Sequence, residues 1–118
     1  MTTAPSSYPT YPELRARRLA ARRATAIDAL KTADALARGS GGRLVVFGSL
    51  AEGGFHERSD LDVAVCGLEA PMDGRVAVEV ELALADAGFA ADVIPERFLP
   101  PGLAARVRAH GCEPGALG

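Results

Sequence analysis

Two short apolar segments joined by a small loop constrain the fold of this chain most strongly. The segments RLVVF at 43–47 and LDVAVC at 61–66 have the length and the β-branched residues of buried strands. Residues 49–53 between them are expected to form one or two helical turns. The whole connection is shorter than an ordinary parallel crossover, which includes a full helix. We therefore expect a mixed sheet, in which neighbouring strands can run in opposite directions.

Helix signals lie on both sides of these two strands. Thr10 and Glu13 form the T-x-x-E pattern of a capping box, and an alanine-rich stretch follows until Gly39. Apolar periodicity predicts the remaining elements. The expected helices span 13–38, 75–87 and 101–110, and the expected third strand spans 90–94. This order predicts an α/β fold, with a small mixed sheet flanked by helices and a long N-terminal helix.

The chain is expected to form one domain over residues 10–111, between a disordered segment 1–9 and a flexible tail 112–118. No run approaches the roughly 20 apolar residues of a membrane helix. The first residues lack the apolar stretch of a secretory signal, so we expect a cytoplasmic protein. The formal net charge of -2 gives no general reason to expect nucleic-acid binding. Cys66 and Cys112 lack metal-ligand spacing and are expected to be free thiols.

Asp60 and Asp62 stand at the start of the second strand, where aspartate is an unfavourable residue. Residues i and i+2 of a strand face the same side of the sheet, so both carboxylates are expected on one face. Paired carboxylates on a rigid strand suit Mg²⁺, which would relieve their mutual repulsion. Without a metal, at least one of them is expected to have a raised pKa.

Gly48 and Ser49 follow the first strand directly. A glycine there lets a phosphate approach the backbone closely, and the serine hydroxyl can donate a hydrogen bond to it. Asp92 is the acidic residue of the third expected strand, where a charge needs a reason. We expect it to complete a metal shell or to accept the proton of an attacking hydroxyl. Each feature alone is common as a plain turn or strand cap, but their spacing together indicates a site for Mg²⁺ and a nucleoside triphosphate.

The segment FGSLAEGGFHERSDLDVAV resembles the GS-x10-DxD signature of the DNA polymerase beta-like nucleotidyltransferase superfamily, and most of all its minimal nucleotidyltransferase (MNT) branch. The segment AADVIPERF is similar to the third-carboxylate strand of that family. The resemblance implies that Gly48 and Ser49 hold the triphosphate of ATP. It also implies that Asp60, Asp62 and Asp92 hold two Mg²⁺ ions and carry out catalysis.

The resemblance further implies an activity and a partner. In HEPN–MNT toxin–antitoxin pairs, the MNT antitoxin transfers AMP from ATP to a tyrosine of the HEPN ribonuclease, releases pyrophosphate and silences the toxin. We therefore expect a protein adenylyltransferase whose partner is a HEPN-domain toxin. Because little of the chain follows the third strand, the acceptor is expected to come from a partner or a second subunit. Two alternatives stay open: a non-catalytic antitoxin that occludes its partner, and a transferase acting on a small molecule such as an antibiotic.

Two positions depart from the family pattern. Leu50 and Glu52 stand where many relatives have a basic residue. A carboxylate near a triphosphate is unfavourable, so we expect Arg58, in the loop before Asp60, to supply the missing positive charge as a nucleotide-binding residue.

Positive charge crowds the first half of the long helix. Positive charge near a helix N-terminus opposes the helix dipole, so helix stability does not explain it. A solvated face is one interpretation, docking to an acidic partner surface is the second, and contact with RNA is the third. The residues are Arg15, Arg17, Arg18, Arg22 and Arg23.

Overall fold

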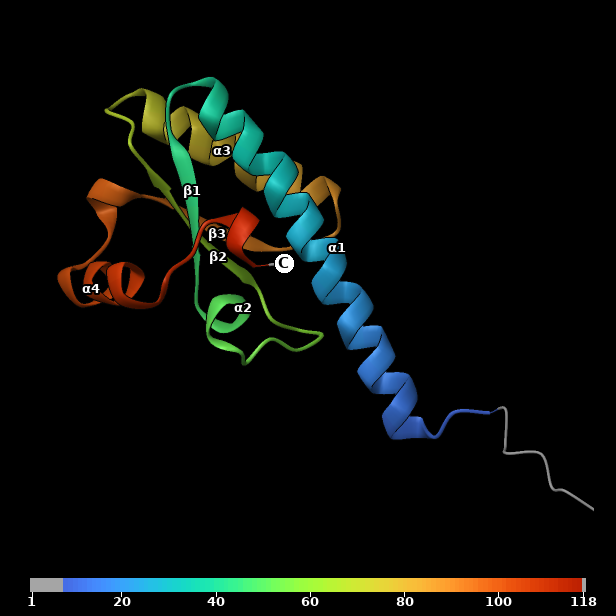
Figure 1. The fold of residues 1–118 in the computed structure, drawn as a ribbon. Helices are drawn as coiled ribbons and strands as arrows, with labels where there is room; N and C mark the ends of the chain where they lie inside the picture. The colour runs from blue at the N-terminus through green and yellow to red at the C-terminus, as the bar shows by residue number, and fades with distance from the viewer. Residues whose placement is uncertain (1–7, 118) are drawn as a thin grey trace, which may run out of the picture.

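A computed structural model of the chain describes residues 8–117. The order of elements along the chain is that of a mixed α/β domain with a long N-terminal helix, as expected (Figure 1). The elements are α1 (Tyr11–Gly39), β1 (Arg43–Phe47), α2 (Ser49–Glu52), β2 (Leu61–Cys66), α3 (Met72–Asp86), β3 (Ala91–Pro95), the 3-10 turn η1 (Glu96–Phe98), α4 (Pro101–His110) and the 3-10 turn η2 (Pro114–Ala116).

The three strands form one mixed sheet in the order β1-β2-β3. β1 runs antiparallel to β2, with Phe47 opposite Asp62. β2 runs parallel to β3, with Asp62 opposite Asp92. The short connection through α2 therefore reverses the chain direction, whereas the parallel pair is joined by a crossover that contains the full helix α3. The prediction of a mixed sheet is confirmed.

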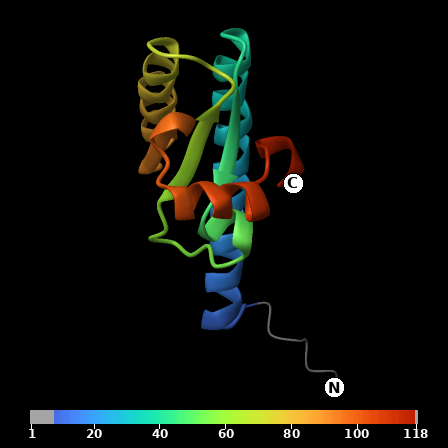
Figure 2. The ribbon, with the colours of Figure 1, turned by 90° about the vertical axis from the view of Figure 1, so that its left-hand side faces the viewer.

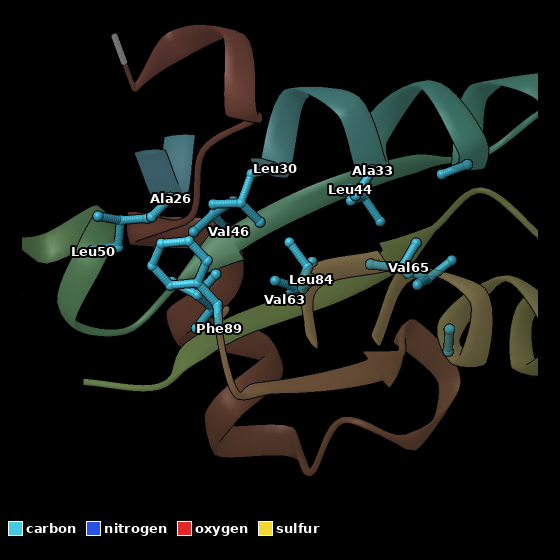
Figure 3. Close-up of a cluster of buried hydrophobic side chains, with 14 of the residues drawn as sticks. Ala26, Leu30, Ala33, Leu44, Val46, Leu50, Val63, Val65, Leu84 and Phe89 are labelled. Carbon is cyan, nitrogen blue, oxygen red and sulfur yellow. The ribbon is translucent and has the colours of Figure 1, made fainter. Parts of the chain in front are cut away.

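Helices cover both faces of this sheet. α1 and α3 lie on one face, and α4 crosses the other (Figures 1 and 2). Burial on both faces explains why the strands are apolar at nearly every position. The larger core, under α1 and α3, includes the side chains labelled in Figure 3: Ala26, Leu30, Ala33, Leu44, Val46, Leu50, Val63, Val65, Leu84 and Phe89. The smaller core, under α4, is built on Phe47, Ala64, Cys66 and Val107.

α1 begins at the predicted capping box. The Glu13 backbone N–H donates to the Thr10 hydroxyl at 3.3 Å, and the Glu13 carboxylate accepts from the Thr10 N–H at 3.1 Å. The first buried residue of the helix is Ala26, and the turns before it extend past the sheet (Figure 1). None of the helices within residues 8–117 is long and apolar enough to cross a membrane.

α3 begins at Met72, earlier than the expected start at Arg75. The reason is a polar contact that apolar periodicity does not reveal. The Asp73 carboxylate accepts hydrogen bonds from the Gly74 N–H at 2.7 Å and from Arg97 Nε at 2.6 Å, and the side chain is 2% exposed. These bonds stabilise the first turn of α3 before its apolar face begins.

The segment 112–117, which was expected to be a flexible tail, packs on the domain. Cys112 and Val46 exchange backbone hydrogen bonds of 2.7 and 2.9 Å at the outer edge of β1. Pro114 is buried, and Leu117 packs against the larger core. A free sheet edge offers unpaired backbone groups, and this segment satisfies some of them. Gly118, together with residues 1–7 of the segment expected to be disordered, lies outside the described residues.

Both cysteines are free thiols, as expected. Cys66 is buried beneath α4, and burial raises the pKa of its thiol to about 11. The pKa of the Cys112 thiol is also raised by burial. Since the thiolate is the reactive form, neither cysteine is set up as a nucleophile.

Candidate active site

The turn between β1 and α2 brings the backbone of Gly48 against Asp62. Gly48 has φ 71° and ψ -151°, a conformation that a residue with a side chain rarely adopts. A Cβ atom at this position would overlap the Asp62 carboxylate and would lie 3.1 Å from its Cγ atom. Only glycine therefore allows the chain to leave β1 here while the carboxylate keeps its place.

Asp62 and Asp92 are partners in the parallel register of β2 and β3. The alternation of the strands puts both carboxylates on the face that α4 covers, because Ala64, two residues after Asp62, belongs to the core under α4. Asp62 is half-buried, whereas Asp60 and Asp92 are exposed. Among residues 8–117 none of these three carboxylates has a hydrogen-bond or ion-pair partner. Their charges are thus not neutralised by the protein.

The pKa of the Asp62 carboxyl is raised. Burial is the largest cause, followed by the charges of Asp92 and then Asp60. The prediction that at least one carboxylate has a raised pKa is confirmed. A cation bound at this site would act in the opposite direction, because it would favour the ionised form.

An open cavity of about 300 Å³ lies over Asp62 and Asp92. It brings together two carboxylates, the bare backbone of Gly48, an arginine and an apolar wall. Its lining residues are Phe47, Gly48, Asp62, Asp92, Ile94, Leu103 and Arg106.

Three of the predicted site residues do not line this cavity. Ser49 is half-buried as the first residue of α2, and Asp60 precedes β2. Arg58 lines a different cavity, of about 340 Å³. His56, from the same loop, and Arg15, on the N-terminal half of α1, line it as well. The structure thus does not bring Arg58, expected to be a nucleotide-binding residue, together with Asp62 and Asp92.

The sequence did not point to Arg106, which lines the cavity from α4. Arg106 Nε donates to both carboxylate oxygens of Glu52 at 3.1 Å, and Arg106 Nη2 lies 2.9 Å from Glu52 Oε2. The unfavourable charge of Glu52 is thereby neutralised from across the domain. A weak signal was present, because Arg106 stands one helical turn after the apolar Leu103, on the same side of an expected helix.

The donor set fits Mg²⁺ bound together with a nucleotide. No group of three or more His, Cys, Asp or Glu side chains within residues 8–117 is arranged as a complete metal site. Mg²⁺ does not require one, because it is commonly bound by one or two carboxylates, with water and substrate phosphates as the other ligands. Asp62 and Asp92 offer two unpaired carboxylates, and the Gly48 backbone lines the cavity beside them.

Comparison with known proteins adds one match. A family model described as "Nucleotidyltransferase domain" matches residues 28–106. That stretch runs from the buried half of α1 to α4, so it contains all three strands and every residue that lines the cavity above Asp62. No curated protein matches the chain.

Proposed function

The chain belongs to the nucleotidyltransferase domain family, and from this premise we propose that it transfers AMP from ATP, with Mg²⁺, to a tyrosine of a HEPN-domain ribonuclease toxin and so acts as the antitoxin. The observation that carries the proposal is the cavity that joins Gly48, Asp62 and Asp92. The choice of ATP, of tyrosine and of the partner rests on the resemblance of FGSLAEGGFHERSDLDVAV to MNT antitoxins.

Each site residue has a role in this proposal. Asp62 and Asp92, with Asp60 at the edge of the site, would hold Mg²⁺, which supplies charge neutralisation at the phosphates and makes the attacking hydroxyl more acidic. Gly48 lines the cavity with its backbone, and the resemblance assigns a hydrogen bond to the phosphates to the hydroxyl of the adjacent Ser49, which lies beside the cavity lining. Asp92 is exposed, so an acceptor can reach it and transfer its proton there.

The reaction is an in-line displacement at the α-phosphorus of ATP. The tyrosine oxygen forms the new bond to phosphorus, the bond from the α-phosphorus to the bridging oxygen breaks, and pyrophosphate leaves with the bonding electron pair. The tyrosine proton passes to Asp92. Positioning of the two reactants supplies much of the rate enhancement in such a transfer, so the partner that carries the tyrosine completes the site.

Labelling with ATP tests the proposal. The protein is incubated with Mg²⁺, with ATP labelled at the α-phosphate, and with purified HEPN ribonucleases as acceptors. We expect label on the acceptor with the wild-type protein, and no label with Asp62→Asn or with the acceptor tyrosine changed to phenylalanine. Asp86→Asn, at the exposed end of α3, is the matched control and should label normally.

Two results would contradict the proposal. The first is an absence of labelling with every acceptor, and the second is unchanged labelling by Asp62→Asn. If Asp60→Ala/Asp62→Ala still silences the ribonuclease fully, occlusion of the partner rather than AMP transfer is the mechanism.

We propose that the partner docks on the N-terminal half of α1. Arg15, Arg17 and Arg18 are exposed there, on turns that extend past the sheet (Figure 1). The other two arginines of the cluster pack on their own domain. Arg22 donates to the Gly88 carbonyl at 3.3 Å with its guanidinium 4.4 Å from the Phe89 ring centre, and Arg23 donates to the Leu117 carbonyl at 3.3 Å.

This docking surface has its own test. Replacing Arg15, Arg17 and Arg18 together by glutamate should weaken binding of the HEPN partner by about tenfold or more, because three charges change sign. Binding of MgATP should stay within about twofold of the wild-type value. Lys31→Glu, exposed on the same helix but outside the cluster, is the control for a general effect of charge. Unchanged partner affinity in the triple variant would remove α1 from the docking surface.

A further inference from the structure

Arg106 is the one cation that lines the cavity holding Asp62 and Asp92, among the residues that the structure describes. It comes from α4 and meets Glu52, which lies 54 residues earlier in the chain, on α2. The Glu52 backbone N–H donates to the Gly48 carbonyl at 2.9 Å, so the ion pair stands next to the turn that carries Gly48.

The ion pair occupies only part of the guanidinium. The Nε–H and the Nη2 group are directed to the Glu52 carboxylate, with atom separations of 2.9 to 3.1 Å. A guanidinium carries five N–H donors, and its second edge can make another bidentate contact to a phosphate. Within residues 8–117, no hydrogen bond or ion pair other than those to Glu52 involves the Arg106 side chain. The Arg106 side chain is 59% exposed, so this second edge is open to a ligand.

A purely structural role, as a strap that holds α2 and α4 together, explains the ion pair between Glu52 and Arg106 poorly. The Glu52 side chain is 24% exposed and Arg106 more than half exposed, and ion pairs in such positions contribute little to stability. Binding of an anionic ligand in this cavity, in contrast, requires a positive charge beside the two carboxylates. Between Phe47 and Phe55 the chain has no lysine or arginine, and Arg58 lines another cavity.

We propose that Arg106 binds the β- and γ-phosphates of the nucleoside triphosphate, and that Glu52 holds the guanidinium at the cavity mouth and competes with the nucleotide for it. This inference rests on the proposed function, because it assigns a residue to the same nucleotide site. It places the phosphate-binding cation on the last helix instead of in the turn after β1. Glu52 then lowers the affinity for nucleotide while it orients the arginine.

Opposite effects of two neutralising substitutions test the inference. Affinities for MgATP and for magnesium pyrophosphate are measured by titration calorimetry with wild-type protein, Arg106→Gln and Glu52→Gln. Arg106→Gln should weaken both ligands by about tenfold or more, because a charge-assisted contact is lost. Glu52→Gln should strengthen both by about threefold or more, because a competing charge is removed while the amide oxygen still accepts from Arg106 Nε.

A rescue variant and a control sharpen the test. In Glu52→Arg/Arg106→Gln the cation moves to position 52, whose side chain already reaches the Arg106 guanidinium, so affinity should recover to within about threefold of wild type. Arg108→Gln, on the same helix but lining another cavity, should bind like wild type. Thermal unfolding of each variant identifies any loss of folded protein.

The measurements distinguish a failure of this inference from a failure of the proposed function. If wild-type protein binds MgATP and Arg106→Gln binds equally well, the inference is overturned and the proposed function stands. If Glu52→Gln and Arg106→Gln weaken binding alike, the pair is a structural strap and the inference is likewise overturned. If wild-type protein binds neither ligand, the proposed function fails, and the role assigned to Arg106 fails with it.

Discussion

Gly48 lies directly against the carboxylate of Asp62, and no Cβ atom fits between them. One contact therefore links the two halves of the motif. The turn after β1 also fixes the carboxylate that faces it. Any side chain at position 48 must displace Asp62 or distort the end of β1, so the geometry of the site depends on the absence of a single carbon atom.

Gly48→Ala should remove nucleotide transfer, by about a hundredfold or more, because the new Cβ displaces the Asp62 carboxylate. The protein should also lose about 1–3 kcal/mol of stability, since alanine is strained at a φ of 71°. Gly53→Ala is the matched control: Gly53 has φ 95°, but a Cβ there meets nothing within 4 Å. It should lose stability and keep most of its activity in the AMP-labelling assay. Equal loss of activity in both variants would mean that backbone strain, and not the contact with Asp62, is responsible.

Asp62→Asn should stabilise the protein at pH 7 while it abolishes transfer. The pKa of Asp62 is raised, so the folded state binds its proton more tightly than the unfolded chain. Its contribution to stability is therefore most favourable below the usual aspartate pKa and falls as pH rises through the raised value. Because part of the side chain faces solvent, we expect a gain of about 0.5–1 kcal/mol in urea unfolding at pH 7, which disappears toward pH 3. A destabilised Asp62→Asn at pH 7 would contradict this account.

Mg²⁺ should raise the melting temperature of wild-type protein but not of the Asp62→Asn variant.

Asp73 should contribute stability at higher pH, whereas Asp62 contributes most at low pH. Its hydrogen bond with Arg97 is the main reason that its pKa lies below the usual value, so folding favours the ionised form. This contribution is fully present above the usual aspartate pKa of about 3.9 and is lost as pH falls through the lowered value. Urea midpoints of wild-type protein and Arg97→Gln should therefore differ at pH 7 and converge as the pH falls through the lowered pKa of Asp73. Arg75→Gln, exposed on α3, should follow wild type across the whole range.

Asp34→Ala should be among the most destabilising single changes on α1. This buried carboxylate accepts the Leu44 N–H at 2.9 Å and Arg38 Nε at 2.7 Å, so it ties the helix to the first residues of β1. Removing it leaves a buried N–H without a partner, at a cost of about 2–3 kcal/mol. Chemical unfolding should show this loss. Asp28→Ala, exposed on the same helix, should change stability by about 0.5 kcal/mol or less.

Elements with local signals were predicted closely. The bounds of β1, β2 and α4 agree with the segments 43–47, 61–66 and 101–110, because short apolar runs between glycines, prolines and polar loops define them. The start of α3 was predicted less accurately. Its first turn depends on the contact between Asp73 and Arg97, and the separation of these residues along the chain hides it from any local pattern.

The site was predictable in part for the same reason. Gly48, Asp62 and Asp92 each stand at a strand end or on a strand, and strand alternation with register brings them to one cavity. Arg58 is near Asp60 in sequence, but its loop turns toward the N-terminal half of α1. Arg106 was missed because nothing in α4 shows which residue of α2 it will meet.

The amino-acid sequence by itself determined where the strands and helices lie, where the chain needs a glycine, and which strands carry carboxylates. These properties follow from backbone sterics and from the two- and 3.6-residue periods, which act over a few residues. Only the tertiary structure decided that Arg106 neutralises Glu52 and that the segment after α4 pairs with the edge of β1. Contacts of this kind depend on the packing of whole helices against the sheet, because a shift of one helical turn would give each side chain a different partner.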